Sequence, residues 1–132
     1  MKGIDTNILV RFLVGDDHDQ AKIVYNLFKE VELNKNELFV PLLVVLELLW
    51  VLESAYNIER NNIIDSISDL ILMPILKFEH LETIQKFIIA GKNSKYDLSD
   101  LLIAHTASSY GCETVFTFDK KASKYSLFEL IK

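Results

Sequence analysis

The sequence predicts an α/β fold, in which helices cover both faces of a central, mainly parallel sheet. Short β-branched or apolar runs alternate with longer segments of helical periodicity along the whole chain. The chain has 132 residues, of which 50% are hydrophobic and 11% aromatic, which is sufficient for one core. No stretch has the composition of a linker. We therefore expect an α/β/α sandwich that forms a single domain over residues 1–132.

In the first half of the chain, two short strands and four helices are predicted from the spacing of apolar residues. Pro41 suits the first turn of the third helix, because its ring fixes a helical φ angle where no amide donor is needed. The elements are a buried strand at Lys2 to Ile4, a helix from Thr6, a helix from about His18 to Leu33, a strand at Leu38 to Val40, a helix from Pro41 to about Tyr56 and a helix from roughly Glu59 to Leu72.

In the second half, proline and glycine mark the boundaries of the predicted elements. Pro74 ends the preceding helix, and Gly91 is expected to end the next one. The elements are a strand at Ile75 to Phe78, a helix at His80 to Ala90, a helix from near Leu98 to Gly111, a buried strand at Thr114 to Phe118 and a short helix before the tail.

Composition and charge limit the classes of function. A formal net charge of -5 argues against a protein that grips nucleic acid by bulk electrostatics, although it does not exclude a nuclease. Lysines at 92, 95, 120, 121 and 124 provide local positive charge, and they equally fit solvated loop or helix faces. The lone Cys112 indicates a reducing compartment, so we expect a cytoplasmic protein. No apolar run reaches the ~18 residues that span a bilayer.

Four carboxylates lie at the ends or centres of apolar segments: Asp5, Glu47, Asp100 and Asp119. Glu47 is the only charge in PLLVVLELLWVL, and burying an unpaired carboxylate costs several kcal/mol or forces it to become neutral. A divalent cation would turn the mutual repulsion of these acids into coordination. The set therefore predicts a metal site, and Asp5 and Asp119 are placed at the carboxyl ends of strands, where α/β sheets carry their sites.

Helix capping is the competing explanation for several of these acids. Asp5 suits the N-cap of the helix from Thr6, and Asp119 suits the N-cap of one from Lys120. Asp97 and Asp100 are spaced like a capping box, but residues three apart also share a helix face and can point at one metal. Both readings stay open for these residues, whereas Glu47 has no capping role.

The remaining polar and aromatic residues give weaker indications. None of the three histidines is assigned to catalysis, and His105 lies five residues past Asp100, off its helix face. Trp50 and Tyr56 fit core or interface positions better than base-stacking platforms. The chain carries no glycine-rich phosphate loop.

With these residues in place, the chain resembles the PIN-domain family, and within it the VapC-type toxins of prokaryotic toxin-antitoxin pairs. Four motifs in order carry the resemblance across essentially the whole chain: IDTNILV, VVLELLWVL, YDLSDLLIAHTA and TFDKKASK. The resemblance implies that the catalytic and metal-binding residues are Asp5, Glu47, Asp100 and Asp119, with Asp97 auxiliary and Thr6, Asn7 and Thr117 close to the metal.

The same resemblance implies a Mg²⁺- or Mn²⁺-dependent endoribonuclease with a PIN-like fold. It further implies a homodimer, an RNA substrate and a separately encoded antitoxin that plugs the cleft.

Three alternative functions compete with the one that this resemblance implies. A catalytically silent PIN fold would bind RNA or act as a scaffold, although the presence of all four acids disfavours this. A haloacid-dehalogenase phosphatase would need a second acid where Asn7 stands, and a receiver domain would need a phosphoacceptor Asp after a middle strand.

Overall fold

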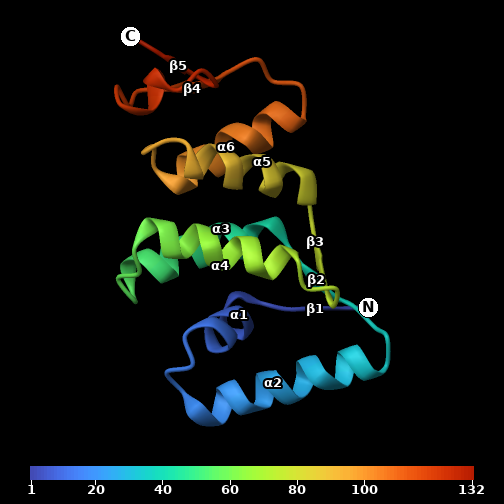
Figure 1. The fold of residues 1–132 in the computed structure, drawn as a ribbon. Helices are drawn as coiled ribbons and strands as arrows, with labels where there is room; N and C mark the ends of the chain where they lie inside the picture. The colour runs from blue at the N-terminus through green and yellow to red at the C-terminus, as the bar shows by residue number, and fades with distance from the viewer. The chain divides into compact units, whose positions relative to one another are not determined.

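The computed structural model describes the whole chain, Met1–Lys132. The chain forms two compact units, Met1–Leu81 and Glu82–Lys132 (Figure 1). All strand pairs in both units are parallel, as the alternation of strands and helices predicted. That the whole chain acts as one nuclease domain stays a prediction.

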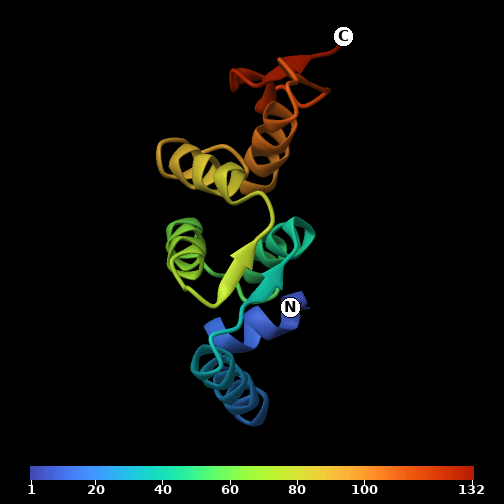
Figure 2. The ribbon, with the colours of Figure 1, turned by 90° about the vertical axis from the view of Figure 1, so that its right-hand side faces the viewer.

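The first unit contains a three-stranded parallel sheet with the strand order β1-β2-β3. Its strands are β1 (Lys2–Gly3), β2 (Leu38–Val40) and β3 (Leu76–Phe78), and the last two lie side by side in Figure 2. The amide of Ile4 donates a hydrogen bond to the carbonyl oxygen of Phe39 (3.0 Å), which extends the pairing of β1 one residue further. The chain leaves β1 directly before Asp5, so this acid follows the carboxyl end of a strand, as predicted.

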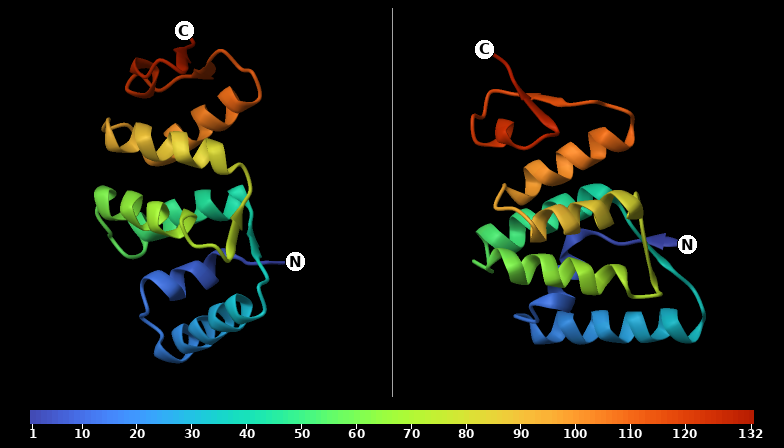
Figure 3. Two further views of the ribbon diagram at one scale, coloured as in Figure 1. Left: turned by 45° about the vertical axis from the view of Figure 1, so that its right-hand side comes forward. Right: turned by 45° about the horizontal axis from the view of Figure 1, so that its top comes forward.

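Four helices pack around this sheet. Helix α1 packs against α2 and α3, and α4 packs against α3 and β3. Figures 1 and 3 show α3 and α4 running together on one side of the strands, with α2 on the other side. The core between them is aliphatic and includes Leu9, Val45, Leu48 and Ile67, all fully buried. The helices are α1 (Thr6–Leu13), α2 (His18–Leu33), α3 (Leu42–Ser54) and α4 (Arg60–Ile71).

The second unit consists of two helices and a small parallel sheet, in which β4 pairs with β5. Its small core joins Ala104, Ala122 and Phe128, with Tyr125 packed against them. The last strand was not predicted, because three residues near the end of the chain carry no alternating pattern of their own. The elements are α5 (Leu81–Lys92), α6 (Leu98–Ser109), β4 (Val115–Thr117), η1 (Ala122–Lys124) and β5 (Phe128–Leu130).

Three expectations about these elements were wrong. Gly91 does not end α5, because the helix continues to Lys92 and Gly91 is buried within it. The strand at Lys2–Gly3 is exposed rather than buried, since β1 has a neighbour on one side only in its sheet. Phe116 in β4 is likewise 67% exposed. None of the helices combines the length and the hydropathy that a membrane span requires.

Candidate functional site

Asp5 connects β1 to α1 and caps the helix. Its carboxylate accepts a hydrogen bond from the amide of Ile8 at 3.4 Å, as expected for an N-cap aspartate. It also lines a pocket of about 380 Å³. Of its neighbours in the first motif, Thr6 is buried and Asn7 is exposed. The side chain of Asp5 is itself exposed, so capping leaves it available to a ligand.

Glu47 lies in the middle of α3, and the prediction that its side chain is buried was wrong. Its side chain is exposed, as are Leu43 and Trp50, which are 77% and 64% exposed. Residues four before and three after a helical position share its face, so α3 presents a partly apolar stripe centred on Glu47. The exposure of Trp50 also excludes a position in the core. The candidacy of Glu47 thus depends on its motif and not on the cost of burying a charge.

Asp97 and Asp100 stand together at the amino end of α6. Asp97 is the N-cap, and its carboxylate accepts a hydrogen bond from the amide of Asp100 at 3.1 Å. The Asp100 side chain is partly buried. This burial raises the pKa of Asp100 above its ordinary value, and the nearby charges of Asp97 and Asp119 raise it further. The second unit therefore gathers three of the predicted acids, close enough to oppose the ionisation of the central one.

Asp119 follows β4 and is held by the backbone after it. Its carboxylate oxygen Oδ1 accepts hydrogen bonds from the amides of Lys121 (2.8 Å) and Ala122 (3.1 Å), at the start of η1. The hydroxyl of Thr117 accepts a hydrogen bond from the amide of Asp119 at 3.0 Å. Asp119 thus stabilises the turn that leads into η1, but no helix begins at Lys120, and the N-cap of η1 is Lys121. Thr117 orients the backbone that carries the acid.

The donor set of the second unit has the chemistry of a hard-cation site. Carboxylate oxygens are the ligands that Mg²⁺ and Mn²⁺ prefer, and a cation would relieve the repulsion that raises the pKa of Asp100. No group of three or more His, Cys, Asp or Glu side chains stands close enough in the structure to hold a metal ion. Asp5 and Glu47 belong to the first unit, so a centre shared by all four acids stays a prediction.

Several lysines flank the acids of the second unit in sequence. Those that precede Asp100 and those that follow Asp119 are exposed: Lys92, Lys95, Lys120, Lys121 and Lys124. The amide of Lys121 contacts the Asp119 carboxylate, while its ammonium group is free to face solvent. Exposed ammonium groups beside carboxylates are suited to phosphate oxygens, although such charges also serve solubility alone.

One polar contact in this unit was not predicted from the sequence. The ring nitrogen Nε2 of His105 and the hydroxyl of Tyr125 lie 2.8 Å apart. The pKa of His105 is lowered by burial and, to a lesser degree, by the charge of Lys86. The two residues are 20 positions apart and share no motif, so no sequence pattern could have paired them.

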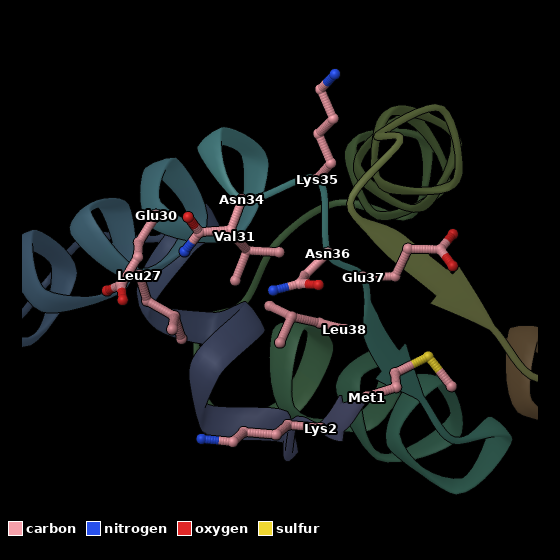
Figure 4. A pocket seen from close by; sticks show the side chains of 10 residues that line it. All are labelled: Met1, Lys2, Leu27, Glu30, Val31, Asn34, Lys35, Asn36, Glu37 and Leu38. Carbon is pink, nitrogen blue, oxygen red and sulfur yellow. The ribbon is translucent and has the colours of Figure 1, made fainter.

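A larger pocket, of about 570 Å³, lies at the amino ends of β1 and β2 (Figure 4). Leu27 and Val31 of α2 and Leu38 of β2 line it, and the side chain of Lys35 extends away from them. None of the predicted acids borders this pocket. It shares Lys2, Leu27 and Leu38 with the smaller pocket that Asp5 lines.

Comparisons with known proteins agree with the motifs. The family model of the PIN domain matches residues 3–127. The chain is also similar to a VapC ribonuclease of Aquifex aeolicus (strain VF5), with 27% identity over 124 residues. That alignment covers 94% of this chain and 91% of the relative. The matched region contains all the predicted acids.

Proposed function

Because the chain belongs to the PIN-domain family, we propose that it is a Mg²⁺- or Mn²⁺-dependent endoribonuclease and the toxin of a toxin-antitoxin pair. Its proposed metal ligands are Asp5, Glu47, Asp100 and Asp119. RNA is the proposed substrate because the similar protein of Aquifex aeolicus is named VapC ribonuclease.

The observation that carries the proposal is the crowding of acids around Asp100. Its pKa is raised by burial and by two further carboxylates, an arrangement that costs folding free energy unless a cation compensates it. Perturbed carboxylates of this kind are concentrated at functional sites. The position of these acids inside the stretch matched by the PIN-domain model supports a metal-dependent hydrolase over a structural cluster.

Each residue has a distinct task in this proposal. Asp5, Asp100 and Asp119 would hold the cation through their carboxylates, of which those of Asp5 and Asp119 are already fixed by hydrogen bonds from backbone amides. Glu47 would complete the set from the exposed face of α3. Asp97 orients the first turn of α6, so its part as a ligand is auxiliary. When bound, a divalent cation activates water for attack on the phosphodiester and stabilises the charge that develops on the leaving oxygen.

Cleavage of a total-RNA pool by the purified protein tests this proposal. The reactions contain Mg²⁺, Mn²⁺ or chelator, and every new 5′ end is mapped. The matched variant is Asp5→Asn, because asparagine caps a helix as well as aspartate does and only the charge is lost. We expect discrete, metal-dependent cuts that leave 5′-phosphate and 3′-hydroxyl ends and that the variant does not make. Equal cutting by both proteins would exclude Asp5 as a ligand.

The second candidate is a catalytically silent PIN fold that binds RNA or acts as a scaffold. A thermal titration with Mn²⁺ discriminates the two. A ligand that binds only the native state at 100 times its dissociation constant stabilises it by about 2.7 kcal/mol. We expect a rise in melting temperature for the wild type, whereas a silent scaffold shows none.

The proposal also includes a homodimer and a partner antitoxin, and exposed apolar side chains on α2 support a protein partner. Ile23 and Leu33 are 66% and 83% exposed, unlike Ile63 and Ile67 of α4, which are buried. Helix α2 therefore presents apolar side chains to solvent, as does Leu72 at the end of α4, which is 77% exposed. Expression of the protein alone should arrest growth, and co-expression of the neighbouring gene product should restore it.

A further inference from the structure

Three aromatic side chains form a cluster in the second unit. The rings of Tyr96 and Tyr125 lie 5.1 Å apart, and the rings of Tyr125 and His105 lie 5.9 Å apart, both tilted. The Tyr125 hydroxyl also lies 2.8 Å from Nε2 of His105. Tilted aromatic pairs at such distances are attractive beyond the area they bury. Tyr125 is the shared member, because it contacts both of the other rings.

On one side, Tyr125 ends the segment that begins at Asp119. The carbonyl oxygen of Asp119 accepts a hydrogen bond from Ser123 (3.0 Å), and that of Ala122 accepts one from Tyr125 (3.0 Å). The Asp119 carboxylate holds the amides of Lys121 and Ala122. Residues 119–125 therefore form one hydrogen-bonded turn, with the acid at its start and the tyrosine at its end.

On the other side, both partners of Tyr125 belong to α6 or to the residues that lead into it. Tyr96 directly precedes Asp97, the N-cap of α6, and His105 lies in the middle of the same helix. Ala104, next to His105, packs with Ala122 in the small core of this unit. The cluster thus joins the helix that carries Asp100 to the turn that carries Asp119.

The contact joins two groups that are uncharged at neutral pH. Burial raises the pKa of the Tyr125 phenol, and the charge of Tyr96 raises it further. Burial lowers the pKa of His105. Depending on its tautomer, a neutral imidazole accepts a hydrogen bond from the phenol at Nε2 or donates one to it from Nε2–H. Either way the pair forms a hydrogen bond between neutral groups, which does not depend on salt as an exposed ion pair would.

We propose that Tyr125 is a positioning residue, which holds Asp119 opposite Asp100 through its hydrogen bond to His105 and its ring contact with Tyr96. This inference rests on the proposed function, because it takes Asp100 and Asp119 to be metal ligands. The turn would keep their two carboxylates close together against their mutual repulsion. Without Tyr125, that repulsion favours movement of the turn at residues 119–125 away from the amino end of α6. The backbone hydrogen bonds to the Asp119 carboxylate then open more often.

Hydrogen exchange of the backbone amides of Lys121 and Ala122, followed by NMR in the metal-free protein, measures this directly. The test variant is Tyr125→Phe, which keeps the ring and removes only the hydroxyl. Loss of one hydrogen bond of ordinary strength is expected to speed exchange of both amides about fivefold. The matched control is Tyr25→Phe, which removes a hydroxyl from a half-exposed tyrosine that keeps its ring contact with Phe12.

His105 provides a second pair of variants that does not alter Tyr125. His105→Ala should speed exchange at Lys121 and Ala122 in the same way, and His105→Gln should restore slow exchange, because glutamine presents a polar atom at a similar distance from the helix. A purely structural role would lower global stability in denaturant and speed exchange throughout the unit. The positioning role predicts faster exchange confined to the turn and weaker Mn²⁺ binding.

The outcomes separate this inference from the proposed function. If the two amides exchange as slowly in Tyr125→Phe and His105→Ala as in the wild type, the positioning role is excluded, whether or not the protein cuts RNA. If exchange rises in the turn while the wild type neither binds Mn²⁺ nor cleaves RNA, the proposed function fails and Tyr125 still positions Asp119. Faster exchange together with a raised dissociation constant for Mn²⁺ supports both.

Discussion

The acids of the two units differ in how the fold holds them. In the first unit, Asp5 and Glu47 are exposed and stand on different helices. In the second unit, partial burial raises the pKa of Asp100, and the negative charges of Asp97 and Asp119 raise it further. Capping and metal binding do not exclude each other, because a carboxylate that accepts backbone hydrogen bonds is already fixed in place and still has free lone pairs. The second unit is therefore the more preorganised half of the proposed centre.

The largest expected effect is on catalysis, and it tests whether both units contribute. We expect Asp100→Asn and Glu47→Gln each to reduce metal-dependent RNA cleavage by roughly 10³-fold, since each removes a negatively charged ligand whose loss weakens charge stabilisation by several kcal/mol. Matched controls are Asp65→Asn and Glu53→Gln, which neutralise exposed acids on α4 and α3. Cleavage rates at saturating Mg²⁺ measure the effect. Full activity in Glu47→Gln would exclude Glu47 as a ligand and leave Asp5 as the contribution of the first unit.

A smaller effect is expected on stability at the amino end of α6. Asp97→Ala removes the N-cap hydrogen bond to the amide of Asp100 and should lower the free energy of unfolding by about 1 kcal/mol. Asp97→Asn keeps a capping oxygen and should cost much less. Urea denaturation of the metal-free proteins measures both. If Asp97→Asn retains stability but loses Mn²⁺ affinity as strongly as Asp100→Asn, then Asp97 is a ligand in its own right.

The smallest expected effect is the pH dependence that Asp100 imposes on the metal-free protein. Its folded-state pKa is raised above the ordinary 3.8, so the unfolded chain releases this proton at lower pH than the native state does. The contribution of Asp100 to stability is therefore most favourable at low pH and declines as the pH rises from 3.8 through the raised value. Unfolding free energies in chelator, measured from acidic to neutral pH, should show a smaller decline in Asp100→Asn than in Asp65→Asn.

Much of the fold could be predicted because local pattern and local structure agree. The helix from His18 to Leu33 and the strand from Leu38 to Val40 have the predicted bounds, since a capping aspartate and a clear apolar period define them. The predicted caps Asp5 and Asp97 form their hydrogen bonds for the same reason. The helix end predicted at Gly91 was wrong, because Gly91 is buried inside α5 and the helix continues to Lys92.

The burial of Glu47 was predicted wrongly for a general physical reason. An apolar helix can expose one face while it buries the others, and composition alone does not say which face meets solvent. In α3 the exposed face carries Leu43, Glu47 and Trp50, so the only charge of the segment lies among apolar neighbours without being buried. The energetic argument for Glu47 was therefore incorrect, and its role as a ligand stays a prediction from the motif.

Local sequence patterns were enough to predict the class of the fold, the order of most elements and the acids that the motifs contain. These features depend on residues close together in the chain, where spacing fixes which side chains share a face or cap a helix. The tertiary structure was needed to bring the charge of Asp119 close to Asp100 and to place His105 against Tyr125. Such contacts join segments distant in sequence, and they arise from how the helices and turns pack rather than from any local pattern.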